Sequence, residues 1–226
     1  MQTVYKQHIK TQVCEIFIQM KKILFLILAL FAIHSIKGQT SFNSSLFNFQ
    51  SGLSPKREVR AVWLTTIGGL DWPHSYAQSP ASITKQKKEL QIILDQLKSA
   101  GINTVLFQTR IRGTVVYPSD YEPWDGCLSG VPNKSPGYDA LEFAIEECHK
   151  RGMEIQAWIV TIPIGKWNQA GCKNLRNRYP SLVKKIGEEG FMDMENPQTA
   201  QYLANICGEI TNKYDIDGIH LDYIRY

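Results

Sequence analysis

The sequence lacks the short motifs of several common enzyme classes. It has no GxGxxG or P-loop segment for nucleotide phosphates, no HExxH pair for zinc and no GxSxG nucleophile turn. Histidine is scarce, because residues 39–226 contain only His74, His149 and His220. These absences disfavour nucleotide-dependent enzymes, zinc hydrolases and serine hydrolases. Carboxylate chemistry, with no metal or cofactor, is the mechanism we expect.

Excess charge is also absent once the first 38 residues are set aside. Lys21 and Lys22 precede an apolar run of 11 residues, ILFLILALFAI, and a short polar stretch then ends at Gly38. This order is typical of a secretory signal peptide, and the run is shorter than the roughly 20 residues that span a bilayer. We predict translation from Met20, cleavage after Gly38 and export without a stable membrane anchor. An uncleaved anchor helix is the alternative.

Residues 39–226 carry equal numbers of basic and acidic side chains. A neutral chain gives no support for a nucleic-acid or anionic-membrane partner. Residues 39–57 are polar and rich in Ser and Asn, which predicts a linker. Cys148 and Cys207 fall within helical patterns and are expected in the core. Cys127 and Cys172 fall in predicted loops, where they form either a disulfide in an oxidising compartment or two free thiols.

Strands and helices alternate from residue 58 onward. Alternation with crossover helices predicts a parallel sheet. The helix-to-strand connections are short and the strand-to-helix connections are long, which places the active site at the carboxyl ends of the strands. Apolar spacing predicts strands over 59–66, 103–110, 154–160 and 218–222, helices over 83–100, 140–151 and 199–212, and long loops over 111–137 and 161–196.

The last predicted strand carries the best catalytic candidate. Side chains alternate across a strand, so His220 and Asp222 share one face while Ile219 and Leu221 share the other. We expect the polar pair to point into a barrel, with Asp222 at the carboxyl end, where catalytic residues of such barrels lie. The alternative is a structural Asp222 that pairs with Arg110 or Arg225. Asp217, at the opposite end of the strand, is expected to be structural.

The other strands and loops supply groups that suit sugar hydroxyls and sugar faces. The predicted inward layer gathers Gln108, Arg110, Gln156, Trp158, His220 and Asp222, and the full set of candidate substrate-binding residues is Gln108, Arg110, Trp124, Trp158, His220, Tyr223 and Arg225. The loop aromatics are either a sugar-stacking platform or local cores of their loops; they are Trp72, Tyr117, Tyr121 and Trp124. The loop acids are either a second catalytic carboxylate or solvated turn residues; they are Asp71, Asp120, Glu122 and Asp125.

Four segments of the chain resemble the glycosyl hydrolase-like family 10 domain. They are REVRAVWLTT, GINTVLFQTRIRGTVVYPSDYEPW, GYDALEFAIEECHKRGMEIQAWI and YDIDGIHLDYIRY, and they cover residues 58–226 in order. The resemblance implies an exported bacterial glycosidase with a (β/α)8 fold, in a family of which some members act on peptide-free peptidoglycan strands. It also puts Asp222 at the position of the family's strand-four acid.

We therefore predict a glycoside hydrolase that uses two carboxylates, one of them Asp222 as nucleophile or transition-state stabiliser, kept ionised by Arg110. An eight-stranded barrel needs about 250 residues. We accordingly expect residues 58–226 to hold only the first four strands, the second acid to lie beyond Tyr226, and the 226-residue chain alone to be inactive. A carbohydrate-binding barrel without catalysis, and an inactive fragment of a split gene, are the alternatives.

Overall fold

A computed structural model gives the structure of residues 58–225. The predicted start at Met20, the signal peptide and the linker over 39–57 lie outside these residues. Within the described part of the chain, no helix has both the length and the apolar character needed to cross a bilayer.

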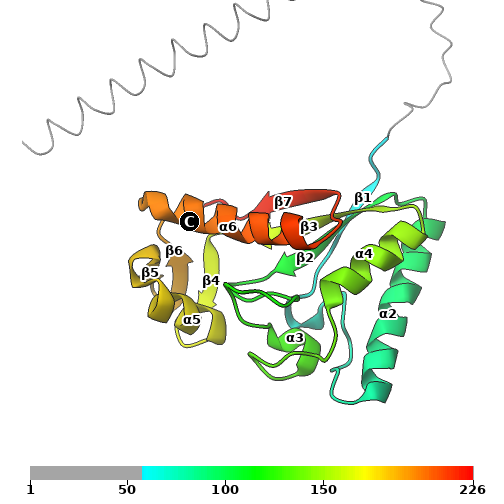
Figure 1. The fold of residues 1–226 in the computed structure, drawn as a ribbon, viewed down its shortest axis with the longest axis horizontal. Coiled ribbons are helices and arrows are strands. Elements are labelled where there is room, and N and C mark those ends of the chain that lie inside the picture. The colour runs from blue at the N-terminus through cyan, green and yellow to red at the C-terminus, as the bar shows by residue number, and fades with distance from the viewer. Residues whose placement is uncertain (1–57, 226) are drawn as a thin grey trace, which may run out of the picture. The chain divides into compact units, whose positions relative to one another are not determined.

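Four parallel strands form the central sheet (Figure 1). They are β1 (Ala61–Leu64), β2 (Thr104–Arg110), β3 (Glu154–Val160) and β7 (Gly218–Asp222), in the spatial order β1-β2-β3-β7. The register places Trp158 of β3 between Gln108 of β2 and His220 of β7. The four predicted strands and their parallel pairing are confirmed, although β1 is shorter than the predicted 59–66 at both ends.

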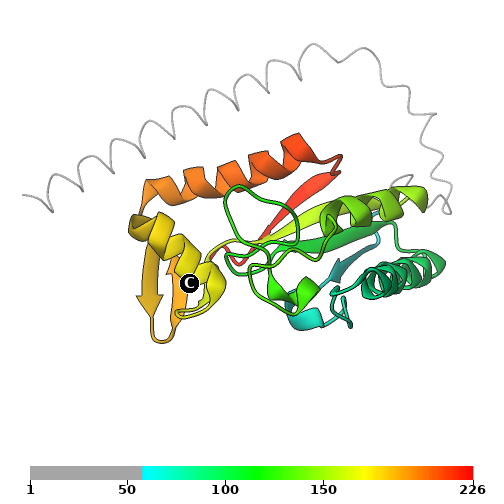
Figure 2. The ribbon, with the colours of Figure 1, turned by 60° about the horizontal axis from the view of Figure 1, so that its bottom comes forward.

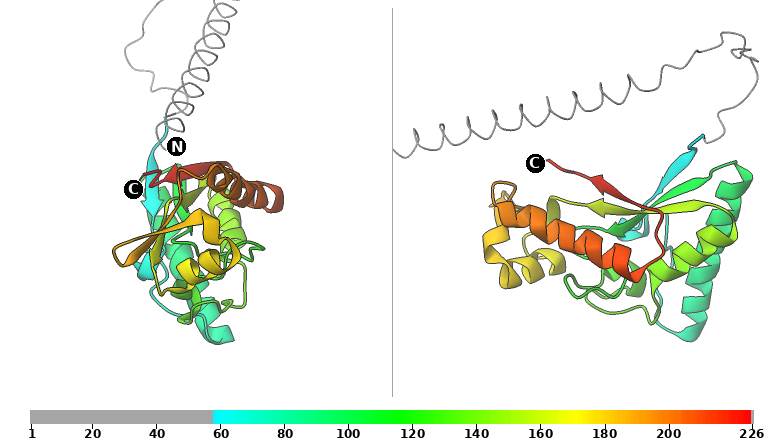
Figure 3. Two further views of the ribbon diagram at one scale, coloured as in Figure 1. Left: turned by 90° about the vertical axis from the view of Figure 1, so that its left-hand side faces the viewer. Right: turned by 45° about the horizontal axis from the view of Figure 1, so that its top comes forward.

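Three helices connect these strands and cover one face of the sheet (Figure 3). They are α2 (Pro80–Ser99), α4 (Ala140–Lys150) and α6 (Pro197–Lys213). A cap residue starts each one: Ser79 accepts a hydrogen bond from the backbone N–H of Ser82, and Asp139 and Asn196 likewise cap α4 and α6. The capping box of Ser79 and Ser82 starts α2 at Pro80, three residues before the predicted Ile83.

The main core lies between the helices and the sheet. Apolar residues at helical spacing are at most 1% exposed; they include Leu90 and Leu94 of α2 and Ile206 and Ile210 of α6. They belong to one cluster with the strand residues on the same side, which include Val105, Phe107, Ile155, Ala157 and Ile159. The arrangement of sheet and crossover helices is that of four successive strands of a (β/α)8 barrel, so the predicted fold class is confirmed.

The stretch predicted as a loop over 161–196 contains ordered structure, and that prediction is wrong. It holds α5 (Ala170–Arg178), the 3-10 turn η3 (Pro180–Leu182) and an antiparallel sheet in the order β4-β6-β5. The strands are β4 (Pro163–Lys166), β5 (Val183–Ile186) and β6 (Glu189–Met192). This small sheet and α5 lie beyond the carboxyl ends of the central strands (Figure 2). The other long connections contain only the turn η2 (Ile67–Gly69) and the short α3 (Gly126–Ser129).

A β-bulge interrupts β2 just before its carboxyl end. Gln108 pairs with Trp158, but the next paired residue is Arg110, opposite Ile159, so Thr109 is the extra residue. An extra residue reverses which face the following side chain occupies. Gln108 therefore stays on the same face as Trp158, whereas Arg110 turns to the helix side.

Candidate active site at the strand ends

Asp222 lies at the carboxyl end of β7 with its carboxylate held by two N–H donors. Its Oδ2 accepts a hydrogen bond from Trp158 Nε1 at 3.0 Å, and its Oδ1 accepts one from the backbone N–H of Tyr223 at 2.7 Å. The backbone carbonyl of Asp222 accepts from both the N–H and the hydroxyl of Thr161. The side chain is half-buried. Within residues 58–225 it forms no ion pair, so the alternative that pairs it with Arg110 or Arg225 is wrong for these residues.

His220 lies on the same face as Asp222 and contacts the opposite edge of the sheet. Trp63 Nε1, on β1, donates a hydrogen bond to His220 Nε2 at 3.3 Å, and the two rings meet edge to face with centroids 5.9 Å apart. The hydrogen bond and the edge-to-face contact together orient the His220 ring toward β1. Contact between the two outer strands shows that the polar face of the sheet is concave.

A pocket of about 300 Å³ opens beside Asp222 at the strand ends. Trp158 and Tyr223, which both donate to the Asp222 carboxylate, line it, and so does Gln108. The Gln108 Oε1 accepts hydrogen bonds from the backbone N–H groups of Thr66 and Ile67, which fixes the loop after β1 against β2. The structure thus brings Tyr223 to the same region as Gln108, Trp158, His220 and Asp222, which belong to the predicted inward layer.

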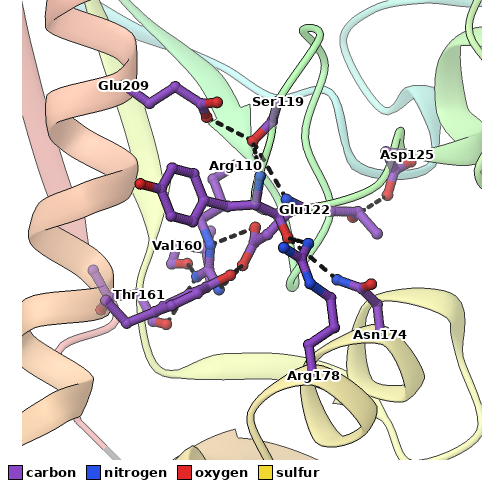
Figure 4. Close-up of polar contacts among 12 residues, drawn as sticks. Arg110, Ser119, Glu122, Asp125, Val160, Thr161, Asn174, Arg178 and Glu209 are labelled. Atoms are coloured by element: carbon purple, nitrogen blue, oxygen red, sulfur yellow. Dashed lines mark hydrogen bonds and ion pairs between the residues drawn. The ribbon is translucent and has the colours of Figure 1, made fainter.

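Arg110 is not part of this face, and its predicted pairing with Asp222 is wrong. Its guanidinium is fully buried on the helix side of the sheet, where Nε and Nη2 bind the two oxygens of Glu122 at 2.8 and 2.7 Å (Figure 4). Its Nη1 donates to the backbone carbonyls of Val160 and Thr161. Burial alone would lower the pKa of Arg110, but the charge of Glu122 raises it above its ordinary value. Arg110 therefore clamps the end of β3 and leaves Asp222 to other partners.

The four loop acids considered for a second carboxylate all have structural partners. Glu122 is bound by Arg110 and by the hydroxyl of Tyr202. Asp125 caps α3 and accepts from the Thr114 hydroxyl, Asp120 is paired with Lys213, and Asp71 accepts from the backbone N–H of Thr65. Asp217 accepts hydrogen bonds from Ile155 N and pairs with His149, as expected for a structural acid.

The loop aromatics divide between the two predicted roles. Trp72 and Tyr117 have no exposed surface, so they form local cores and cannot stack on a sugar. Burial, together with the charge of Glu209, raises the pKa of the Tyr117 hydroxyl. Tyr121 and Trp124 are half-buried, and Trp124 lines a second pocket near the strand ends. Arg225 is exposed beyond β7 and does not line the pocket beside Asp222.

Of the two alternatives for Cys127 and Cys172, the structure has two free thiols and no disulfide between them. Both thiols are free and buried, in different surroundings. Cys127 is on α3, where burial and then the charge of Asp125 raise its pKa. Cys172 faces β6, where a Cβ added to Gly190 would lie within 2.4 Å of its Sγ. Cys148 is a core residue as predicted, whereas Cys207 is only half-buried.

Three residues near the site were not predicted from the sequence. Thr161 binds the backbone of Asp222, Arg112 lines the pocket beside Asp222, and Tyr76 lines the second pocket. Thr161 directly follows β3, and Arg112 lies two residues beyond the end of β2. Their place just beyond a strand end was the signal that could have identified them, since active sites of barrels lie there.

Comparison with known proteins identifies the family. Residues 58–226 match the family described as glycosyl hydrolase-like 10. The chain belongs to this family. It is 33% identical over 182 residues to the glycosyl hydrolase YngK of Bacillus subtilis, a match that covers 79% of the chain and 35% of that relative. It is 29% identical over 184 residues to the glycosyl hydrolase DigH of Escherichia coli K12, covering 74% and 42%. The chain thus spans less than half the length of these curated relatives.

Solved structures show similarity at low sequence identity. A hypothetical protein from Ruminiclostridium thermocellum aligns with a TM-score of 0.46 at 18% identity, over 62% of this chain and 71% of that one. The maltogenic alpha-amylase AmyB from Thermotoga neapolitana aligns with a TM-score of 0.47 at 16% identity, over 71% and 38%.

Proposed function

We propose that the protein is a glycoside hydrolase in which Asp222 is one of two catalytic carboxylates. The observation that carries the proposal is the position of Asp222, at the carboxyl end of a strand and beside a pocket lined by Trp158, Gln108 and Tyr223. This end of the strands is where α/β barrels place their catalytic groups. Membership of a glycosyl hydrolase-like family supports the same reaction class.

The Asp222 carboxylate, oriented by two N–H donors, suits the role of nucleophile or of stabiliser of positive charge. Glycoside hydrolysis passes through an oxocarbenium-like transition state, which one carboxylate attacks or stabilises while a second acid protonates the leaving oxygen. The N–H groups of Trp158 and Tyr223 occupy one oxygen each and fix the orientation of the Asp222 carboxylate. Each of Asp71, Asp120, Glu122 and Asp125 has a structural partner, and none of them lines the pocket beside Asp222, so we propose that the second acid lies outside residues 58–225.

The proposed substrate is a bacterial or environmental glycan, with peptide-free peptidoglycan strands as the first candidate. The proposed location is outside the cytoplasm, at the bacterial surface, in the periplasm or in the medium. The signal-peptide pattern of residues 21–38 supports export. The resemblance of the HLDY segment around Asp222 to the glycosyl hydrolase-like family supports the substrate class.

The test replaces Asp222 by Asn in the full-length protein and measures release of reducing ends from peptide-free glycan strands. We expect activity to be abolished while the thermal unfolding curve stays close to that of the wild type. The matched control is Asp215→Asn, because Asp215 is 97% exposed in the turn before the same strand. Unchanged activity of the Asp222 variant would show that Asp222 is not catalytic.

A carbohydrate-binding barrel is the second candidate. It is favoured by the structural commitment of all four loop acids that were considered as partners of Asp222. Glycan binding by the wild type without any release of reducing ends would establish this alternative. Hydrolysis by the wild type would exclude it.

A further inference from the structure

We infer that a second pocket beside the candidate active site is a glycan subsite for a sugar unit that carries a carboxylate, with Arg112 as the residue that binds it. This inference deepens the proposed function and rests on it. The second pocket has a volume of about 440 Å³, larger than the pocket beside Asp222. Both volumes fall within the range of small-ligand sites.

The two pockets adjoin. Ile67, Ile111 and Arg112 line both of them, so these three residues form a shared wall. A polysaccharide presents several sugar units in a row, and a unit next to the one at Asp222 would occupy the adjoining pocket. The Arg112 side chain, at the shared wall, is then placed to bind a substituent on that neighbouring sugar unit.

Arg112 has the chemistry to bind an anion there. Its side chain is exposed, and within residues 58–225 no hydrogen bond or ion pair engages its guanidinium. The one acid that lines the second pocket, Asp125, has both oxygens occupied by Cys127 N and the Thr114 hydroxyl. A guanidinium without a protein partner offers a planar pair of donors that matches a carboxylate.

The backbone of Arg112 packs closely against the start of α5. A Cβ added to Gly171, at the start of α5, would overlap the Arg112 carbonyl oxygen, so only glycine permits this approach. A Cβ added to Gly165 would meet the Arg112 side chain at 3.5 Å. The close backbone approach fixes where the Arg112 side chain begins, at the wall shared by the two pockets.

Aromatic rings supply a contact that does not depend on charge. Trp124 is half-buried in the wall of the second pocket, and Tyr76 is 56% exposed there. The Tyr76 ring packs over Gly130, where an added Cβ would come within 2.9 Å of it. A fixed and exposed ring suits the apolar face of a sugar. Tyr76 should therefore contribute to neutral and acidic glycans alike, whereas Arg112 should contribute to acidic ones.

The test measures dissociation constants of the full chain by calorimetry for three probes. Peptide-free peptidoglycan strands carry a lactyl carboxylate, hyaluronan oligosaccharides carry a ring carboxylate, and chitohexaose carries none. We expect the wild type to bind at least one acidic probe more tightly than chitohexaose. The probe that is preferred identifies whether the carboxylate is a lactyl group or part of the ring.

Variants assign the preference to Arg112. Arg112→Ala should weaken binding of the preferred acidic probe about tenfold or more and leave chitohexaose unchanged. Arg112→Lys should lose part of that affinity, because lysine keeps the positive charge but lacks the planar pair of N–H donors of the guanidinium. Tyr76→Ala should weaken all probes that bind. Lys173→Ala is the charge-matched control, since Lys173 is an exposed residue of α5 that lines neither pocket.

Equal affinity of the wild type for acidic and neutral probes would overturn the inference, and so would absence of binding to any probe. Equal losses in Arg112→Ala and Lys173→Ala would also overturn it, because the effect would then be one of overall charge. Failure of the proposed function is separate, since it shows as retained release of reducing ends in Asp222→Asn. The Arg112 measurements do not involve catalysis and remain interpretable in that case.

Discussion

The Arg110–Glu122 ion pair ties three segments together at the carboxyl ends of the strands. Both side chains are completely buried, and Glu122 accepts from the Tyr202 hydroxyl of α6 as well as from Arg110. Arg110 also donates to the carbonyl of Thr161 (Figure 4). The Thr161 hydroxyl in turn donates to the backbone carbonyl of Asp222. The pair therefore supports the position of Asp222 from behind the sheet without touching its carboxylate.

Removing one partner of this pair should be costly. Arg110→Met leaves the Glu122 carboxylate buried without its cation, and we expect the free energy of unfolding to fall by about 3–5 kcal/mol. Urea denaturation followed by circular dichroism measures the loss. In the double variant Arg110→Met with Glu122→Leu, no buried charge remains and most of the loss should be recovered. A single variant as stable as the wild type would contradict the prediction.

Glu147 gives a stability contribution that depends on pH. Burial raises the pKa of its carboxyl, but hydrogen bonds from Arg151 and Lys150 outweigh burial and hold it below the ordinary value of 4.5. A lowered folded pKa stabilises the protein above pH 4.5, and this contribution is lost as the pH falls through the folded pKa. Glu147→Gln should therefore cost about 0.5–1 kcal/mol at pH 7 and progressively less in acid.

Urea denaturation of wild type and variant over a series of pH values checks this dependence. The control is Glu146→Gln, because Glu146 is 56% exposed and its contact with Lys150 is longer, at 3.4 Å. This control should change stability little at any pH. A difference between wild type and Glu147→Gln that stays constant down to strongly acidic pH would refute the assignment.

At the level of single residues, the sequence predicted the strand face of a side chain better than its hydrogen-bond and ion-pair partners. Strand alternation placed Asp222, His220 and Trp158 on one face correctly, because period-two alternation holds through β3 and β7. It failed for Arg110, since a bulge at the preceding residue has no signature in a run such as FQTR. The ion pair with Glu122 depends on a loop that folds back over the strand end, which local patterns do not determine.

At the scale of the elements, two helical glycines test whether α5 packs tightly against the segment that follows β2. Gly171 in α5 approaches the backbone of Arg112, and an added Cβ would overlap the Arg112 carbonyl oxygen. Gly208 in α6 has nothing within 4 Å. We expect Gly171→Ala to destabilise the protein by about 1–3 kcal/mol through overpacking. Gly208→Ala should instead stabilise it by about 0.5–1 kcal/mol through helix propensity.

Thermal or urea unfolding distinguishes the two outcomes by sign. Gly208 lies inside α6 and has the full propensity gain, whereas Gly171 is the second residue of α5, where the gain is smaller and the close approach to Arg112 opposes it. Equal stabilisation by both variants would mean that α5 shifts freely away from Arg112. That result would also show that the backbone of Arg112 is not held by α5.

The elements that were predicted correctly have strong local signals, and the missed ones have weak signals. The helices α4 and α6 carry apolar residues at regular spacing and have Asp139 and Asn196 as caps. The strands β4, β5 and β6 have four residues each and include glycine, lysine and proline. Such short strands depend on pairing with one another, so the sequence from 161 to 196 resembles a loop until its tertiary contacts are known.

At the scale of the whole molecule, the curvature of the sheet determines where the site lies. Trp63 of β1 and His220 of β7 belong to the two outer strands, yet their rings meet across the concave face. A flat four-stranded sheet would keep them apart, because neighbouring strands are separated by about 4.8 Å. The pocket beside Asp222 therefore forms at the strand ends of a curled sheet, as in a barrel.

The same curled sheet leaves two outer strands with a neighbour on one side only among the described residues. Apolar side chains are exposed along them: Leu221 of β7 is 46% exposed, and Ile224, just beyond it, is 56% exposed. Unpaired edges with apolar side chains favour association between chains.

We expect residues 39–226 to self-associate with rising concentration, and Leu221→Lys to reduce the association measured by sedimentation velocity. Ile92→Lys is the matched control, since Ile92 is 45% exposed on α2, away from both edges. If both variants reduced association equally, the sheet edge would not be the contact; a chain monomeric at all concentrations would refute the prediction.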